Sequence, residues 1–420
     1  MTDPARNAAL DLLTAALARR AGLETGLEAP GFGRLSPQDR AFARALAMVT
    51  LRRLGQIDRA LAARLTREPP ESVRMILRLG AAQLFYLDTP HYAAVGATVD
   101  LAAAQPATAP FKGLVNAVLR RLGREGPPAN DPEDLAPPWL FARWRAAYGE
   151  DAARAVAAVI ADEPATDLTP RDPADAPALA EALEAQSLAG GSLRRPGGGR
   201  IEEWPGFAEG RWWVQDAAAA VPARLLAVRP GDTALDLCAA PGGKALQLAA
   251  AGAKVTALDR SAARLRRLTA GLERTGLAAE VVAVEAEAWA DPRTFDAVLL
   301  DAPCSSTGTF RRNPDVLWSI RPGDIAKLAD VQARLLDAAA PRVSPGGRLV
   351  YCVCSLEPEE GEAQARDVLR RHPEFQPAPI EAGEGGAPTA SVTPEGWLRI
   401  LPSHLDGGLD GFFVARFRKR

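Results

Sequence analysis

The 420-residue sequence is poor in cysteine and has no long apolar run. Four cysteines in a chain of this length form no disulfide framework, which indicates a reducing compartment. No apolar stretch approaches the roughly 20 residues of a membrane-spanning helix. The first seven residues lack the basic and apolar regions of a signal peptide. We therefore expect a cytoplasmic protein without a membrane partner.

Residues that bind metals are also scarce. No Cys-x-x-Cys occurs, and the three histidines, His91, His372 and His404, match no ligand spacing. We also expect Cys352 and Cys354 to point to opposite faces of one strand, which would prevent them from sharing an ion. The sequence thus predicts no metal site.

Lysine occurs only five times, so arginine carries nearly all of the positive charge. The net charge of −2 hides an asymmetry, because the segment through Glu125 has 17 basic and 11 acidic residues and carries about +6. Seven arginines fall between Arg52 and Arg78. Such a segment fits a polyanion partner such as RNA, and it fits a solvated helix face equally well.

Length and patterning predict several domains. Residues 1–125 repeat apolar side chains at helical spacing, and Ser36 followed by Pro37 is typical of a helix start. Residues 126–138 have the Pro-, Asn- and Asp-rich composition of a linker. We interpret the mixed pattern that follows, up to residue 215, as a small α+β subdomain.

From about residue 216, short apolar runs alternate with helical patterns such as Ser261–Thr275 and Asp324–Ala340. This alternation predicts a doubly wound, Rossmann-like α/β domain, closed by a strand at Gly411–Arg418. The other expected strands are Thr233–Cys238, Lys254–Asp259, Val281–Val284, Phe295–Leu300 and Gly347–Cys354.

The first of these strands leads into a loop of small residues, in which the backbone can approach a ligand closely. No Gly-x-Gly-x-x-Gly fingerprint occurs, which disfavours NAD and FAD. At the next strand ends, Asp259 is placed for ribose hydroxyls and Glu287 for an adenine, with Glu285 as the alternative. The loop itself reads Cys238, Ala239, Ala240, Pro241, Gly242, Gly243 and Lys244.

Two cysteines follow the fourth and fifth strands, and adjacent strand ends lie about 5 Å apart. Cys304 and Cys354 can therefore face one pocket, whereas Cys238 and Cys352 fit ordinary buried positions. A thiolate added to C6 of cytosine makes C5 nucleophilic, so a thiol here fits C5 methylation. Asp301 is the candidate donor near N3, and Lys244 would bind the base or orient Asp301.

At these motifs the sequence resembles a known family. Residues 216–418 resemble the catalytic domain of RNA cytosine-C5 methyltransferases, and the stretch Lys112–Arg121 resembles NusB-like RNA-binding domains. The combination is similar to bacterial enzymes of the Sun/Fmu (RsmB) type, which modify 16S rRNA. The motifs that carry the resemblance are Asp236–Lys244, Asp301–Ser305, Arg311–Asp315, Cys354-Ser355 and Asp410–Phe413.

The resemblance implies a multidomain protein: an all-α NusB-like domain over residues 1–125, a small RNA-recognition-like subdomain over 139–215 and a class I methyltransferase domain over 216–420. It implies S-adenosylmethionine as the cofactor, bound by residues 238–244, Asp259, Glu287 and Asp301. Cys354 would be the nucleophile, and Cys304 would assist release of the product. RNA, in particular small-subunit ribosomal RNA, is the implied partner of an enzyme that we expect to be a monomer.

The sequence departs from the family pattern at three positions. Val353 replaces the usual Thr before the nucleophile, Ser306 stands where Gly is common, and Glu287 replaces Asp. None of these changes removes a catalytic group. For RNA contacts we expect Arg311 and Arg312 to bind phosphates, and we consider Trp204, Trp212 and Trp213 as stacking platforms that fit core positions better.

Three alternatives remain open. A NusB-like assembly factor with an inert methyltransferase domain is opposed by the intact Cys304, Cys354, Asp301 and Lys244. A DNA cytosine methyltransferase would use Cys304 as its nucleophile. An NAD-dependent oxidoreductase is disfavoured by the missing glycine fingerprint.

Overall fold

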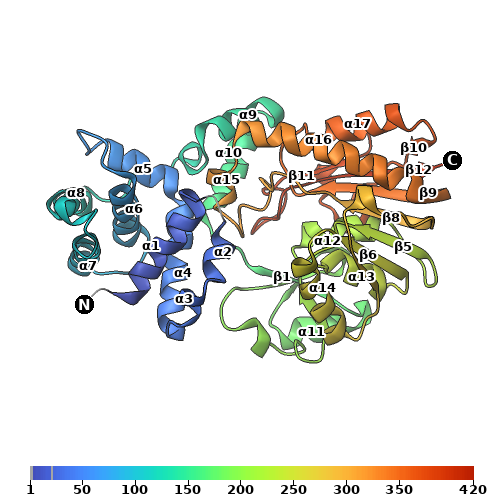
Figure 1. The fold of residues 1–420 in the computed structure, drawn as a ribbon, viewed down its shortest axis with the longest axis horizontal. Coiled ribbons are helices and arrows are strands. Elements are labelled where there is room, and N and C mark those ends of the chain that lie inside the picture. Colours follow the sequence, from blue (N-terminus) through green and yellow to red (C-terminus); the bar gives the residue numbers. More distant parts are fainter. Residues whose placement is uncertain (1–2, 20–21) are drawn as a thin grey trace. The chain divides into compact units, whose positions relative to one another are not determined.

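A computed structural model describes residues 3–19 and 22–420 of the chain (Figure 1). The chain divides into two compact units. One comprises Met1–Asp162 with Arg312–Ile320, and the other comprises Glu163–Arg311 with Arg321–Arg420. In the part of the chain that the structure describes, no helix is long and apolar enough to cross a membrane.

The first unit is helical, as predicted. Its long helices bury one apolar core, in which Leu13, Leu46 and Ile76 have no exposed surface. The predicted helix start is confirmed, because Ser36 accepts a hydrogen bond from the N–H of Asp39. The helices are α1 (Pro4–Leu17), α2 (Leu23–Leu27), α3 (Pro30–Gly33), α4 (Pro37–Arg52), α5 (Leu54–Ala62), α6 (Glu71–Tyr86), α7 (His91–Ala103), α8 (Lys112–Glu125), α9 (Pro138–Tyr148), α10 (Glu150–Ala158) and α15 (Val316–Ser319).

Helices α9 and α10 belong to this first unit, whereas the sequence pattern assigned them to the following subdomain. Their apolar side chains are buried at helical spacing, and α10 is tied to the segment before α9 by an ion pair of 2.8 Å between Arg154 and Asp131. The predicted range 139–215 therefore spans the boundary between two units.

The second unit begins with a small antiparallel sheet of strand order β2-β3-β1-β4, flanked by α11 (Ala176–Ala182). Leu168, Leu179 and Trp212 lie in its core without exposed surface. This is the small α+β subdomain that the mixed pattern predicts. Its strands are β1 (Thr166–Pro170), β2 (Gln186–Ser187), β3 (Leu193–Arg195) and β4 (Trp212–Val214).

The larger sheet of this unit has eight strands in the order β10-β12-β9-β8-β5-β6-β7, with β11 paired to β12. Strands β9, β8, β5, β6 and β7 are parallel, which confirms the predicted Rossmann-like core, and β12 runs antiparallel to β9. The strands are β5 (Thr233–Leu237), β6 (Lys254–Asp259), β7 (Glu280–Ala283), β8 (Phe295–Asp301), β9 (Val343–Val353), β10 (Phe375–Pro377), β11 (Leu398–Ile400) and β12 (Phe412–Lys419).

Helices cover both faces of this sheet (Figure 1). One face packs against α12 (Ala217–Leu225), α13 (Gly243–Ala250) and α14 (Ala262–Thr275). The other packs against α16 (Pro322–Ala339) and α17 (Glu362–Arg371). The chain leaves β5 toward β6 on one side and later returns to β8 on the other, so the strand order reverses between β5 and β8. Open sheets of this kind bind ligands at such a reversal.

Candidate active site

The two cysteines at the ends of β8 and β9 lie in contact. Cys304 Sγ and Cys354 Sγ are 3.4 Å apart, and both side chains are partly buried. The hydrogen bond between them lowers the pKa of Cys354, and a further contact of 3.7 Å with the Ser306 hydroxyl acts in the same direction. The same bond, together with burial, raises the pKa of Cys304. The contact thus shifts the pKa values of the two thiols in opposite directions, and it makes Cys354 the more acidic of the pair.

Beside the thiols, the buried Lys244 and the partly exposed Asp301 form an ion pair. Lys244 Nζ lies 2.7 Å from Asp301 Oδ2 and 5.2 Å from the centre of the Phe412 ring. Burial alone would lower the pKa of Lys244, but the charge and hydrogen bond of Asp301, together with Cys352 and Asp236, outweigh burial and raise it. The other carboxylate oxygen of Asp301 accepts from the Cys352 thiol at 3.4 Å. The lysine is therefore a fixed positive charge at the pocket.

Asp236 lies on β5 next to this pair and has no exposed surface. Neither of its carboxylate oxygens has a hydrogen-bond partner among the residues that the structure describes. Burial, and then the charge of Asp301, raise the pKa of Asp236 to about 8. A cationic group of a bound ligand would supply the interaction partner that this buried carboxyl group lacks.

The loop after β5 leaves little room for larger side chains. At Gly242, which has a φ of 117°, an added Cβ would lie 2.4 Å from Leu268. Cys238 is also left-handed, with a φ of 64°, and burial raises its pKa to about 12. Ala239 and Ala240 are buried, and the Ala240–Pro241 peptide bond is cis. The loop ends at Gly243, the first residue of α13, which is followed by Lys244.

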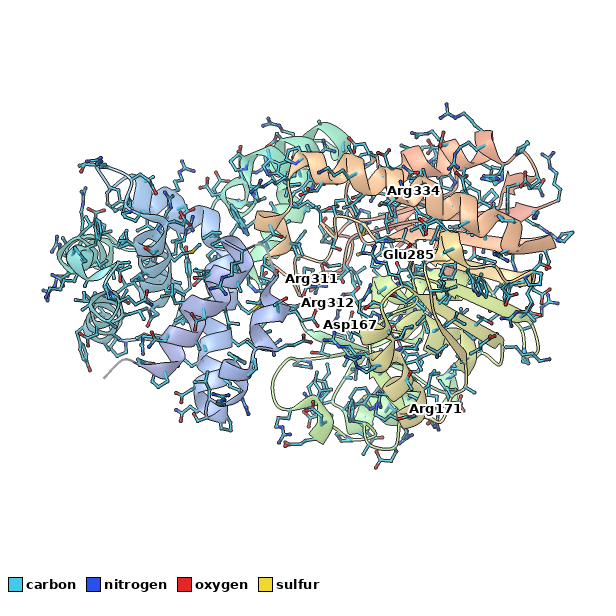
Figure 2. The ribbon with its side chains drawn as sticks, viewed as in Figure 1. Asp167, Arg171, Glu285, Arg311, Arg312 and Arg334 are labelled. Atoms are coloured by element: carbon cyan, nitrogen blue, oxygen red, sulfur yellow. The ribbon has the colours of Figure 1, made fainter. Side chains whose placement is uncertain are left out.

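Asp259, at the end of β6, is almost fully buried and binds this loop. Its carboxylate accepts from the N–H of Ala240 at 3.2 Å and from the N–H of Ser261 at 2.8 Å. After β7, Glu287 lies on a short 3-10 turn with its carboxylate 3.9 Å from Arg334 on α16. Figure 2 labels Arg334 and Glu285, which lies at the start of the same turn. Acidic side chains thus lie at or just after the carboxyl ends of β5, β6, β7 and β8.

The RNA contact expected of Arg311 is wrong. Arg311 is 2% exposed and pairs with Asp216 at 3.3 Å, so it is not available to a phosphate. Arg312 is exposed, and its expected phosphate contact stays a prediction. The three tryptophans, Trp204, Trp212 and Trp213, are buried in cores, as the alternative interpretation held.

Most of the seven arginines between Arg52 and Arg78 serve the helical unit itself. Arg52 is buried, and Arg78 pairs with Asp58 at 2.8 Å. Arg59, Arg64 and Arg74 also pair with carboxylates. Most of these arginines are therefore engaged in pairs within the fold, and they give no separate support for an RNA partner.

The expectation that Cys352 and Cys354 point to opposite faces is wrong as well. Residues two apart on a strand share a face, and both side chains pack against the same apolar cluster. Cys352 is fully buried below the site and contacts Asp301. The described residues contain no group of three or more metal-binding side chains in a ligating arrangement.

Sequence reasoning missed a buried network behind the thiols. The carboxylate of Glu360 accepts hydrogen bonds from the hydroxyls of Ser305 and Ser355, and from the N–H of Ser305 at 2.9 Å. Glu360 has no exposed surface, although it lies in the acidic run 357–362, which has the composition of a solvated loop. The signal in the sequence was that a serine directly follows both Cys304 and Cys354.

Comparisons with known proteins connect this geometry to a family. A model of the 16S rRNA methyltransferases RsmB/F matches residues 223–418, and a model of the NusB family matches residues 3–124. A ribosomal RNA small subunit methyltransferase B from Xanthomonas campestris pv. campestris is 38% identical over 99% of this chain and 97% of its own. This chain belongs to the RsmB/F family of 16S rRNA methyltransferases.

Other relatives agree with that assignment. A probable ribosomal RNA small subunit methyltransferase B from Synechocystis sp. is 37% identical over 92% of both chains. Among solved structures, PH0851 has a TM-score of 0.78 at 24% identity over 100% of this chain and 99% of its own. A methyltransferase homologue from Pyrococcus horikoshii has a TM-score of 0.57 at 26% identity over 67% of this chain and 95% of its own.

Membership of the RsmB/F family makes this chain an S-adenosylmethionine-dependent RNA methyltransferase. The RsmB/F match contains the paired thiols, Lys244 and Asp301. The NusB match runs from before α1 to within α8.

Proposed function

We propose that this RsmB/F enzyme methylates C5 of a cytosine in RNA, through a covalent bond between Cys354 and C6 of the base. One observation carries the proposal: two cysteine thiols lie 3.4 Å apart, beside the partly buried Lys244–Asp301 pair. A methyltransferase that modifies a nucleophilic nitrogen or oxygen needs no such thiol. C5 of cytosine is a poor nucleophile until another group adds to C6.

The acidic loop ends fit S-adenosylmethionine, which carries a sulfonium and an ammonium group. The unpartnered Asp236 carboxyl lies on β5 just before the loop 238–243 and is available to a cationic group of the cofactor. Asp259 would bind the ribose, Glu287 the adenine side, and Asp301 and Lys244 the end that faces the base. When bound, the cofactor supplies an electrophilic methyl group.

In this mechanism the Cys354 thiolate adds to C6, and the C5=C6 electron pair becomes available at C5. Asp301 and Lys244 hold the base at N3 and its neighbours and stabilise the charge that develops there. After C5 is methylated, it loses its proton to a base, the C5=C6 bond re-forms and the bond between C6 and sulfur breaks. The protonated Cys304 then donates a hydrogen bond to the departing Cys354 thiolate and stabilises it as a leaving group.

We propose 16S ribosomal RNA as the substrate because the named relatives are small-subunit ribosomal RNA methyltransferases. The target base must leave its stack to reach a pocket at the strand ends. The NusB-family helical unit would supply RNA affinity outside that pocket. A DNA-type mechanism with Cys304 as nucleophile is disfavoured, because the contact with Cys354 and burial raise the pKa of Cys304.

The identity of the product tests this function. We would incubate the purified enzyme with S-adenosylmethionine and unmodified small-subunit RNA, digest the RNA to nucleosides and identify the methylated nucleoside by mass spectrometry. A DNA of the same sequence and the Cys354→Ser variant are the controls. 5-Methylcytidine from RNA and wild type only is expected; another methylated nucleoside, or equal activity on DNA, would overturn the proposal.

A further inference from the structure

We propose that Glu360 is the positioning residue that decides which of the two cysteines is the nucleophile. Its carboxylate binds the residue that follows each cysteine, and it places its negative charge on the Cys304 side of the pair. The consequence for catalysis rests on the proposed covalent function, but the ordering of the two thiols can be measured without RNA or cofactor.

The contacts of Glu360 carry the first step. One carboxylate oxygen accepts from the Ser305 N–H at 2.9 Å and from Gln332 Nε2 at 3.1 Å, and the other accepts from the hydroxyls of Ser305 and Ser355. The two serine hydroxyls are themselves 3.0 Å apart. Because the serines directly follow Cys304 and Cys354, one buried carboxylate keeps both loop ends together.

The contacts of Glu360 with the two cysteine loops, which together form a clamp, are not symmetric. On the Cys304 side, Glu360 binds the main chain of Ser305, and Gln332 bridges the same carboxylate to the carbonyl of Pro303 at 3.0 Å. On the Cys354 side, the contact is through the Ser355 hydroxyl. Both peptide neighbours of Cys304 are therefore tied to Glu360.

Further contacts hold this network in place. The Tyr351 hydroxyl donates to the Glu360 backbone carbonyl, Thr307 connects the loop to Glu357, and Arg399 binds the Ser355 carbonyl while it pairs with Glu362. The Glu360 charge contributes to raising the pKa of Cys304, after the bond to Cys354 and burial. It does not act on Cys354, whose pKa is raised by the charge of Asp301 and lowered by Lys244.

A substitution that removes the negative charge of Glu360 and keeps its shape tests the proposal. We would alkylate wild type, Glu360→Gln and Glu359→Gln with iodoacetamide at several pH values and follow each cysteine by mass spectrometry. Glu359 is the matched control, because it is the preceding glutamate and is exposed. In wild type and Glu359→Gln, Cys354 should react faster than Cys304. In Glu360→Gln the ratio should fall by about tenfold, the effect of one pKa unit.

An unchanged ratio in folded Glu360→Gln would overturn the proposal, because a merely structural role would leave the order of the thiols intact. If Glu360→Gln does not fold, Ser305→Ala and Ser355→Ala each remove one arm of the clamp and keep the charge. Both should keep Cys354 as the faster thiol and lose turnover. Faster alkylation of Cys304 in either variant contradicts the assignment to Glu360.

Discussion

Ser306 has a left-handed backbone, with a φ of 57°, and its hydroxyl oxygen lies 3.7 Å from Cys354 Sγ. This conformation explains why glycine is common at the position, since glycine adopts it without strain. A serine retains about 1–2 kcal/mol of strain there. In return, its hydroxyl contributes to lowering the pKa of the nucleophile, a contribution that glycine cannot make.

We therefore expect Ser306→Gly to raise thermal stability and to impair the enzyme at low pH. Loss of the hydroxyl raises the pKa of Cys354, so the acidic limb of kcat/KM should move to higher pH. The rates of variant and wild type should converge at pH values where Cys354 is ionised in both proteins. Ser306→Ala is the control, because it removes the hydroxyl and keeps the left-handed strain. It should show the same pH shift without the gain in stability, and two profiles identical to wild type would contradict this role.

Asp236 should make stability depend on pH. Its pKa of about 8 in the folded protein exceeds the unfolded value of about 3.9, so above about pH 4 the folded state binds a proton that the unfolded state releases. Its contribution to stability therefore falls as pH rises through that window, by up to about 1.4 kcal/mol per pH unit. Asp236→Asn should remove the dependence.

Chemical denaturation of wild type and Asp236→Asn between about pH 5 and 8 measures the effect. The exposed Asp330→Asn on α16 serves as the control and should follow wild type at every pH. A constant difference between wild type and Asp236→Asn across the range would show that Asp236 is ionised throughout.

Lys244 and Asp301 should behave as one unit. Lys244→Met leaves the Asp301 carboxylate without its counter-charge. Removal of one partner of a fully buried ion pair costs about 3–5 kcal/mol, and the partial exposure of Asp301 makes the expected loss smaller than that. The double variant Lys244→Met/Asp301→Asn should recover part of that stability but none of the activity. A double-mutant cycle on unfolding free energy and on kcat/KM measures both. Additive losses in stability would contradict the pairing.

Gly308 holds the loop of Cys304 against the start of β12. A Cβ added there would lie 2.1 Å from the Gly411 carbonyl oxygen, and the Gly308 N–H donates to the Cys354 carbonyl at 3.0 Å. We expect Gly308→Ala to displace Cys304 from Cys354, with a loss of stability and of turnover. Gly323→Ala on α16 is the control, since an added Cβ there meets no atom within 4 Å. Activity and melting temperature of the two variants distinguish a local clash from a general glycine effect.

The regular parts of the catalytic fold were predictable because they depend on local pattern. Apolar runs and their spacing placed β5 to β9 and α14 within a few residues of their observed bounds. Adjacency of β8 and β9 then brought Cys304 and Cys354 together. The acidic residues that end successive strands followed from the same topology.

Features that depend on partners far along the chain were not predictable. The sequence predicts Arg311 to be an exposed cation, because its partner Asp216 lies 95 residues away along the chain. Glu360 reads as a loop charge until two serines and Gln332 converge on it. The type of a side chain determines the free energy that its burial costs. The hydrogen-bond and charge partners that offset this cost depend on the tertiary structure.

Covalent trapping tests the central claim most directly. Wild type, Cys304→Ala and Cys354→Ser would be incubated with S-adenosylmethionine and unmodified small-subunit RNA, and then separated under denaturing conditions. We expect Cys304→Ala to accumulate a stable protein–RNA band, because alanine offers the departing thiolate no hydrogen-bond donor, and Cys354→Ser to give neither band nor methylation. Methylation by Cys354→Ser, or an adduct that requires Cys304, would contradict the assignment of the nucleophile.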